Sequence, residues 1–240
     1  MEIQIAVAKI NKHDTLESGD TLEFVERPHG GISVVMADAQ ISGNAAKAVS
    51  SSVVRKVIGM LGEGIRDGAA ARAASDFLFT ERNGSVFAYL NIISIDLQTC
   101  TIVISRNNPT PSYVAFGERI ETLSGESHPI GTSRNIRPAI SEIALESGIT
   151  VMTFTDGLLN AGNNLGVSFD ICTLLESLLE EQDPSAQSIA DTILNEAIRL
   201  DNQKPQDDMS LVVLRVLPHF SDPIRRMTIK LPFQNQDFTH

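Results

Sequence analysis

The sequence predicts a single α+β domain over residues 1–217, followed by an extension over residues 218–240. Apolar runs of strand length occur in neighbouring pairs with hairpin-length links, and segments with helical spacing also occur in pairs. The chain after residue 217 contains three prolines around one short apolar run. Paired strands and paired helices favour antiparallel sheets with helices packed on them, because a parallel sheet would alternate strand and helix.

The N-terminal half contains a strand, a hairpin, two helices and a second strand pair. The first strand alternates polar and apolar residues, and the hairpin turns at Pro28-His29-Gly30. The first helix repeats apolar residues at helical spacing, and the second is rich in alanine, the best helix former. The expected elements are strands at 3–10, 18–27 and 31–38, helices at 43–61 and 66–79, and strands at 85–96 and 100–106.

The C-terminal half repeats this arrangement of paired strands and paired helices. We expect the last helix to begin after an N-cap at Asp183, with Pro184 as its first residue. A further short strand, MTIKL at 227–231, lies in the extension and could pair at a sheet edge. The other expected elements are strands at 111–117, 118–123, 136–145, 149–156 and 209–216, and helices at 169–179 and 185–200.

Composition excludes several classes of function. The chain has 19 Lys and Arg against 30 Asp and Glu, a net charge of −11, so it lacks the basic surface that nucleic acids require. No apolar run reaches about 18 residues and no basic leader precedes one, so we expect a cytoplasmic protein without a membrane partner. Cys100 and Cys172 lack zinc-ligand spacing. The acidic surplus is consistent either with solubility or with a carboxylate-lined cation site.

Several aspartates fall at the ends of expected strands. Asp20 and Asp38 each lie nine residues from His29 at the hairpin turn, so they should meet at one end of the sheet. Asp156 ends another apolar strand, and Asp207 begins the last one beside Asp208. Carboxylates held this close repel each other unless a cation or proton lies between them. Oxygen ligands of this kind suit Mg²⁺ or Mn²⁺.

These aspartates belong to an ordered set of motifs that resembles the metal-dependent protein phosphatases, the PPM or protein phosphatase 2C family. The likeness covers about residues 18–216 and is greatest to the bacterial SpoIIE/RsbU/RsbX branch, in particular its single-domain RsbX type. The motifs are Ser18-Gly19-Asp20, Ala37-Asp38, Ser42-Gly43, Asn108-Pro109, Pro129-Ile130-Gly131, Thr155-Asp156-Gly157-Leu158 and Asp207-Asp208-Met209-Ser210.

The resemblance implies a fold, a cofactor and a function. The fold is a four-layer α-β-β-α sandwich, two antiparallel β-sheets flanked by helix pairs. Asp38 would bridge two Mn²⁺ or Mg²⁺ ions, the carbonyl of Ala39 would bind one of them, Asp156 and Asp207 would complete the ligands, and Asp20 would hold a metal-bound water. Water activated by two metals would hydrolyse phosphoserine or phosphothreonine. The partner would be a phosphorylated regulatory protein of the STAS-domain type, in a stress response that controls a sigma factor.

The sequence departs from the family pattern in four places. Ile41 stands where relatives usually have glycine, and Ser105-Arg106-Asn107 replaces the Ala-Gly-His common in the SpoIIE branch. The phosphate-binding arginine of the eukaryotic relatives has no obvious counterpart, which leaves Arg106 and Arg134 as loop candidates. By position, Asp207 rather than Asp208 is the expected ligand.

Two other hypotheses stand beside the phosphatase. A catalytically silent family member would act as a binding module in a partner-switching complex, which Ile41 and the missing Gly-His favour. An aspartyl-phosphate hydrolase of the haloacid dehalogenase type needs a second acid two residues after the nucleophile. Asp38-Ala39-Gln40 lacks that acid, and the hairpin pairing does not fit its parallel sheet.

Overall fold

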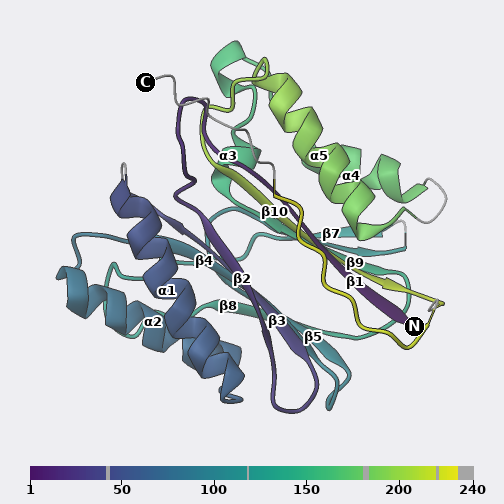
Figure 1. Cartoon of the computed structure of the whole chain (residues 1–240), viewed down its shortest axis with the longest axis horizontal. Coiled ribbons are helices and arrows are strands. Elements are labelled where there is room, and N and C mark those ends of the chain that lie inside the picture. The colour runs from purple at the N-terminus through teal and green to yellow at the C-terminus, as the bar shows by residue number, and fades with distance from the viewer. Residues whose placement is uncertain (42–43, 118, 181–183, 220–221, 232–240) are drawn as a thin grey trace, which may run out of the picture.

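Two five-stranded antiparallel sheets stack face to face in the computed structural model, which describes residues 1–41, 44–117, 119–180, 184–219 and 222–231 (Figure 1). Sheet A has the order β1-β10-β9-β6-β7, and sheet B has the order β2-β3-β4-β5-β8. Sheet A comprises β1 (Glu2–Ile10), β10 (Met209–Leu217), β9 (Ile149–Phe154), β6 (Ser112–Phe116) and β7 (Arg119–Leu123). Sheet B comprises β2 (Thr21–Glu26), β3 (Ile32–Ala39), β4 (Ala88–Asp96), β5 (Thr101–Asn107) and β8 (Ala139–Ala144).

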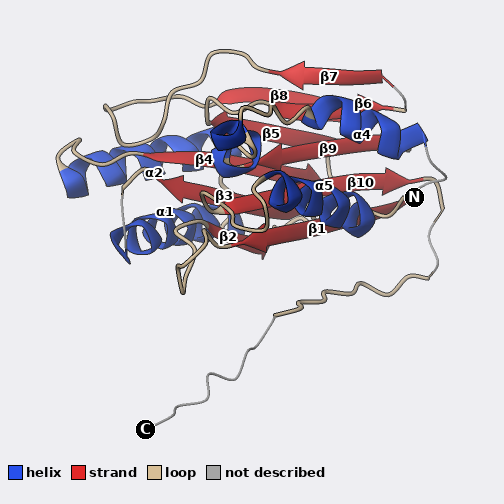
Figure 2. Cartoon of the chain, turned by 90° about the horizontal axis from the view of Figure 1, so that it is seen from above, coloured by secondary structure: helices blue, strands red, loops and turns tan. Residues whose placement is uncertain are grey.

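A pair of helices covers the outer face of each sheet, as Figure 2 shows from above. Helices α1 (Asn44–Gly62) and α2 (Asp67–Arg82) pack on sheet B, and helices α4 (Ile171–Glu180) and α5 (Ala186–Leu200) pack on sheet A. A third apolar cluster fills the space between the sheets. The predicted four-layer α-β-β-α sandwich is therefore confirmed. No helix in the described ranges is long and apolar enough to cross a bilayer.

The central strands are buried on both faces, because each sheet contacts helices on one side and the other sheet on the other. Every residue of β9 is buried, and only Leu217 of β10 is partly exposed. This explains why ITVMTF and MSLVVLRVL are nearly continuous apolar runs instead of alternating ones. The edge strand β8, in contrast, alternates partly buried and exposed residues along its length.

The predicted start of the last helix is wrong. Helix α5 begins at Ala186, and its N-cap is Ser185, whose Oγ accepts a hydrogen bond from the Ser188 backbone N–H at 3.1 Å. Pro184 lies before the cap, and Asp183 lies outside the described residues. A serine side chain in this position satisfies one of the free N–H groups of the first turn. The short helices α3 (Asp156–Leu159) and η1 (Asn163–Leu165) were not expected.

The chain after β10 runs across the side of the sandwich where β1 and β2 are the edge strands. Residues 222–231 form no regular secondary structure, so the expectation of a strand at 227–231 is wrong. Arg225 Nη1 lies 2.7 Å from Glu26 Oε1 of β2, and both side chains are exposed. This segment therefore meets the domain mainly through side chains.

Candidate active site

Two aspartates face each other where β2 begins and β3 ends. Thr21 pairs with Ala37, and the same register continued by one residue sets Asp20 opposite Asp38. Because side chains alternate along a strand, Asp38 points to the same side as Val34 and Met36, which belong to the core between the sheets. The prediction that the hairpin brings Asp20 and Asp38 to one end of the sheet is confirmed.

The pairing of β9 with β10 brings two further aspartates to this end. Phe154 pairs with Leu211, and the Thr155 backbone N–H donates to the Ser210 carbonyl at 3.0 Å. Asp156 follows this pair at the start of α3, and Asp207 lies just before β10. The turn into α3 passes so close to residues 207–208 that only glycine fits at 157. A Cβ there would lie 2.1 Å from the Asp208 carbonyl oxygen.

Gly157→Ala should therefore destabilise the fold and displace Asp156. Overpacking against backbone costs about 1–3 kcal/mol, and we expect Gly157→Ala to reach the upper end of that range in the free energy of unfolding. The matched control is Gly59→Ala, an exposed position inside α1 with no atom within 4 Å of the added Cβ. That change should stabilise the protein by about 0.5–1 kcal/mol. Equal effects of the two substitutions in urea unfolding would contradict this account of the turn.

The carboxylates of the four aspartates are coupled electrostatically. Burial first, and then Asp20, Asp156 and Asp207, raise the pKa of Asp38 to about 9. Burial is also the main cause that raises the pKa of Asp20 to about 7. The pKa of Asp156 is raised by burial and by Asp207, although a hydrogen bond with Asp38 opposes this. Without a cation, the cluster retains protons at neutral pH, since the negative charges repel each other.

The donor chemistry of the cluster fits a hard divalent cation. Asp38 and Asp156 are joined by a side-chain hydrogen bond, so a proton occupies a place between carboxylates that a cation could take. No group of three or more His, Cys, Asp or Glu in the described part of the chain is arranged to hold a metal ion. Mg²⁺ is usually bound by one or two carboxylates together with waters, so a pair of aspartates suffices for each ion.

Asp20 is the most enclosed acid of the cluster. Its Oδ2 accepts hydrogen bonds from Ser210 Oγ at 2.6 Å and from Thr155 Oγ1 at 3.2 Å. Its backbone carbonyl accepts from Lys9 Nζ at 2.6 Å and from Lys47 Nζ at 2.8 Å. Sequence reasoning did not identify these four partners. Thr155 and Ser210 stand inside the quoted motifs, but Lys9 and Lys47 carry no local signal because only the tertiary fold brings β1 and α1 to Asp20.

Asp207 and Asp208 have different surroundings. Asp207 raises the pKa of both Asp38 and Asp156, so it faces the acidic cluster. The Asp208 side chain instead points toward the loop between β1 and β2. Its Oδ1 accepts from the Lys12 backbone N–H at 2.9 Å, and its Oδ2 accepts from the Gly19 backbone N–H at 2.7 Å. Asp208 therefore fastens the loop between β1 and β2 next to Asp20.

The loop after Asp38 follows a path that a β-branched residue tolerates. The Ala39 carbonyl accepts a hydrogen bond from the Ile41 backbone N–H at 2.8 Å, and Ile41 does not have a positive φ. A carbonyl has two lone pairs, so this bond leaves one for another partner. Gln40 Nε2 donates to Asp38 Oδ2 at 2.6 Å. The Ser42-Gly43 motif lies outside the described residues.

The two candidate phosphate-binding arginines make other contacts. Arg106 is buried and donates to the carbonyls of Asn108 and Thr110 at 3.2 Å and of Gly125 at 3.0 Å. This arginine fastens the loop after β5, although sequence reasoning considered it for phosphate. Arg134 stacks over the Phe79 ring of α2 at 5.7 Å.

A protein-family profile described as Stage II sporulation protein E (SpoIIE) matches residues 28–217. The chain belongs to the SpoIIE family. This confirms the resemblance drawn from the motifs. A relative from Priestia megaterium, Stage II sporulation protein E, is 22% identical over 214 residues, which is 89% of this chain. The chain covers only 36% of that relative and 28% of the Bacillus subtilis protein of the same name.

Solved structures of SpoIIE-family and related phosphatases share the fold. The PP2C phosphatase domain of SpoIIE from Bacillus subtilis, with a fragment of its regulatory domain, superposes with a TM-score of 0.77 at 21% identity, covering 90% of this chain and 63% of that one. RsbX in complex with magnesium gives a TM-score of 0.67 at 16% identity, covering 88% of this chain and 94% of that one. At these identities the likeness establishes the fold.

Proposed function

We propose that the protein is a Mn²⁺- or Mg²⁺-dependent serine/threonine protein phosphatase. The observation that carries this proposal is the cluster of Asp20, Asp38, Asp156 and Asp207, whose coupled charges require a proton or a cation at neutral pH. The cluster lies at the end of the sandwich in a chain of the SpoIIE family. The magnesium complex of RsbX supports the choice of cation.

Two ions would be held by the side chains of Asp38, Asp156 and Asp207 and by the carbonyl of Ala39. When bound, they would lower the pKa of water and neutralise negative charge that develops on the phosphoryl group. Asp20 would orient the attacking water through Oδ1, since among the described residues only Oδ2 receives hydrogen bonds. Lys9 and Lys47 hold the Asp20 backbone in place for this role.

The reaction would be a direct hydrolysis. The water oxygen forms a bond to phosphorus as the bond from phosphorus to the serine or threonine oxygen breaks. The serine or threonine oxygen takes up a proton, which balances the proton that the attacking water loses, and the products are inorganic phosphate and the free hydroxyl. No cysteine or serine nucleophile takes part. We further propose that the substrate is a phosphorylated regulatory protein of the STAS-domain type, which the presence of RsbX among the structural neighbours supports.

A silent binding module is the second candidate function. It is favoured by the hydrogen bond from the Ile41 backbone N–H to the Ala39 carbonyl, which occupies one of the two lone pairs of that proposed ligand. Metal binding separates this candidate from the phosphatase, because a silent member need not keep a working metal site.

Hydrolysis of p-nitrophenyl phosphate with EDTA, Mg²⁺ or Mn²⁺ tests the proposal. We expect turnover only with a divalent metal, and we expect Asp156→Asn to reduce it by about 10²–10³-fold, the usual effect of losing one electrostatic contact to the reacting group. Asp191→Asn is the matched control, because this substitution removes the same charge from an exposed position on α5. Absence of both turnover and calorimetric Mn²⁺ binding would refute the enzyme and support the binding module.

A further inference from the structure

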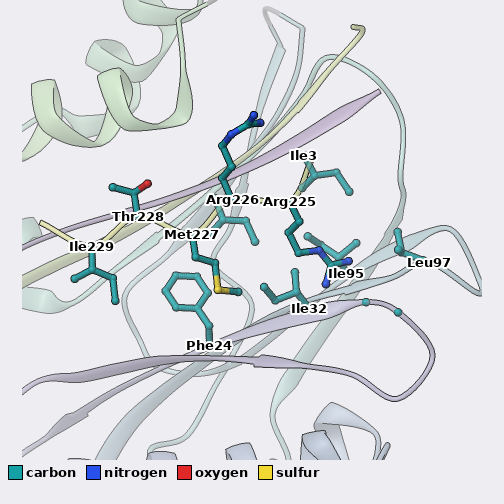
Figure 3. A pocket seen from close by; sticks show the side chains of 13 residues that line it. Ile3, Phe24, Ile32, Ile95, Leu97, Arg225, Arg226, Met227, Thr228 and Ile229 are labelled. Atoms are coloured by element: carbon teal, nitrogen blue, oxygen red, sulfur yellow. The ribbon is translucent and has the colours of Figure 1, made fainter. Parts of the chain in front are cut away.

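An apolar groove lies between the edge strands β1 and β2, under the C-terminal segment of the chain. Its floor is formed by Ile3 and Ile5 of β1, Phe24 of β2, Ile32 of β3 and Ile95 of β4 (Figure 3). Residues 225–229 cross above it and leave a cavity of about 270 Å³. The groove lies apart from the aspartate cluster, since Phe24, its lining residue on β2, is four residues along the chain from Asp20, or roughly 13 Å at the rise of a strand.

The segment alternates its side chains between the groove and solvent. Figure 3 shows Met227 pointing toward the Phe24 ring and Arg225 pointing down toward Ile32, while Arg226 points away from the groove. Arg225 also pairs with Glu26 on the groove rim at 2.7 Å. This period of two is the pattern of an extended peptide that docks alternate side chains at a sheet edge.

The segment fills the groove poorly. Met227 remains 64% exposed and Ile229 92% exposed, while Phe24 beneath them is 41% exposed. Among the described residues, no backbone hydrogen bond joins 222–231 to β1 or β2, although each of these strands has an unpaired edge. Both side chains of the Arg225–Glu26 pair are exposed, and an exposed ion pair contributes little to the stability of a contact. The segment is therefore held loosely and can be displaced.

We propose that this groove docks an extended segment of a partner protein with an arginine followed two residues later by a large aliphatic side chain, and that residues 225–229 occupy the groove as a built-in competitor. The chemistry of the partner is given by the groove, which offers the Glu26 carboxylate on its rim and an apolar floor. A segment that also pairs with a strand edge would bury Phe24 and fill the cavity. This inference goes beyond the phosphatase function and does not depend on it.

The test measures binding of a labelled peptide with the sequence of residues 222–231 to full-length protein by fluorescence anisotropy. Arg225→Glu with Met227→Asp should release the segment and strengthen peptide binding at least about tenfold, because a tethered competitor acts at high effective concentration. Thr228→Asp with Lys230→Glu is the matched control. This control changes the net charge by the same amount as the releasing variant, at two exposed residues. It should bind the peptide with the same affinity as the parent protein.

A third variant locates the binding site. Adding Glu26→Lys to the released protein should abolish peptide binding while the melting temperature stays within the range of the other variants. Failure of the peptide to bind the released protein would overturn the proposal. So would binding that Glu26→Lys does not affect. If light scattering instead shows the parent protein to be a dimer that Arg225→Glu with Met227→Asp dissociates, the occupant is the segment of a second copy, and the proposal of a partner protein is wrong.

Discussion

Asp38→Asn is expected to stabilise the metal-free protein while it removes activity. The carboxyl of Asp38 has its pKa raised from the ordinary 3.8 to about 9, first by burial and then by Asp20, Asp156 and Asp207. The folded state therefore holds protons that the unfolded state has released above pH 4. Under these conditions the free energy of unfolding falls as pH rises, from about pH 4 toward pH 9. Asparagine keeps the shape of the side chain and is neutral without taking up a proton, so the variant avoids this cost of folding.

Thermal unfolding in EDTA at pH 5 to 8.5 measures this effect. At pH 8 we expect Asp38→Asn to gain about 2 kcal/mol or more, a rise in melting temperature of roughly 4–8 °C for a domain of this size. The slope of stability against pH should flatten as well. Turnover with Mn²⁺ should fall by about 10²–10³-fold. A variant that is less stable than the parent at pH 8 in EDTA would show that the acids are not in electrostatic conflict. Asp191→Asn controls for removal of one surface charge.

Asp207 and Asp208 are expected to give opposite phenotypes although they are identical neighbours. Asp208 accepts hydrogen bonds from two backbone N–H groups in the β1–β2 loop. Asp208→Ala leaves both donors without that partner, and should lower the free energy of unfolding by about 2 kcal/mol, because hydrogen bonds to charged groups contribute about 1.5–3 kcal/mol each and one of these is exposed. Asp208→Asn retains one acceptor oxygen and should lose about half as much.

Asp207→Asn should leave stability unchanged or slightly increased, because Asp207 opposes ionisation of its neighbours Asp38 and Asp156. Its effect should appear in calorimetric Mn²⁺ binding, with a loss of affinity of at least about tenfold. Asp208→Asn should retain most Mn²⁺ affinity in a protein that is still folded. The reverse result, loss of metal binding in Asp208→Asn with normal binding in Asp207→Asn, would exchange the two roles.

Most of the fold could be predicted from the sequence, since its strands and its helices each leave a clear local pattern of apolar residues. The hairpin around His29 was predicted correctly because its two strands are adjacent in the chain, and their symmetric spacing set the register that opposes Asp20 and Asp38. The predicted start of α5 was wrong because Asp183 and Ser185 are both residue types that favour the N-cap position. The backbone conformation in the folded protein decides which of them caps the helix. The segment 227–231 has the composition of a strand, but it lacks a paired neighbour.

The surroundings of the acids depend on contacts between residues that lie far apart in the sequence. Lys9 and Lys47 reach the Asp20 carbonyl from β1 and α1, which the sequence separates from each other by more than thirty residues. Arg106 looked available because it ends an expected strand beside a loop, yet it is buried within β5 and its guanidinium donates to three carbonyls of the loops that follow. The identity of the acids could be predicted from motifs, whereas their protonation depends on burial in the sandwich.

The pairing of β1 with β10 has a consequence for how the chain folds. Glu2 pairs with Leu217, so the first and last strands of the domain are neighbours in sheet A. Sheet A therefore cannot be completed until nearly the whole domain has been synthesised, whereas β2, β3, β4 and β5 of sheet B pair in chain order. Contacts so distant in sequence slow folding, because the loop between them must be closed before they form. Sheet B with α1 and α2 is expected to gain protection from hydrogen exchange first, with β1 and β10 last.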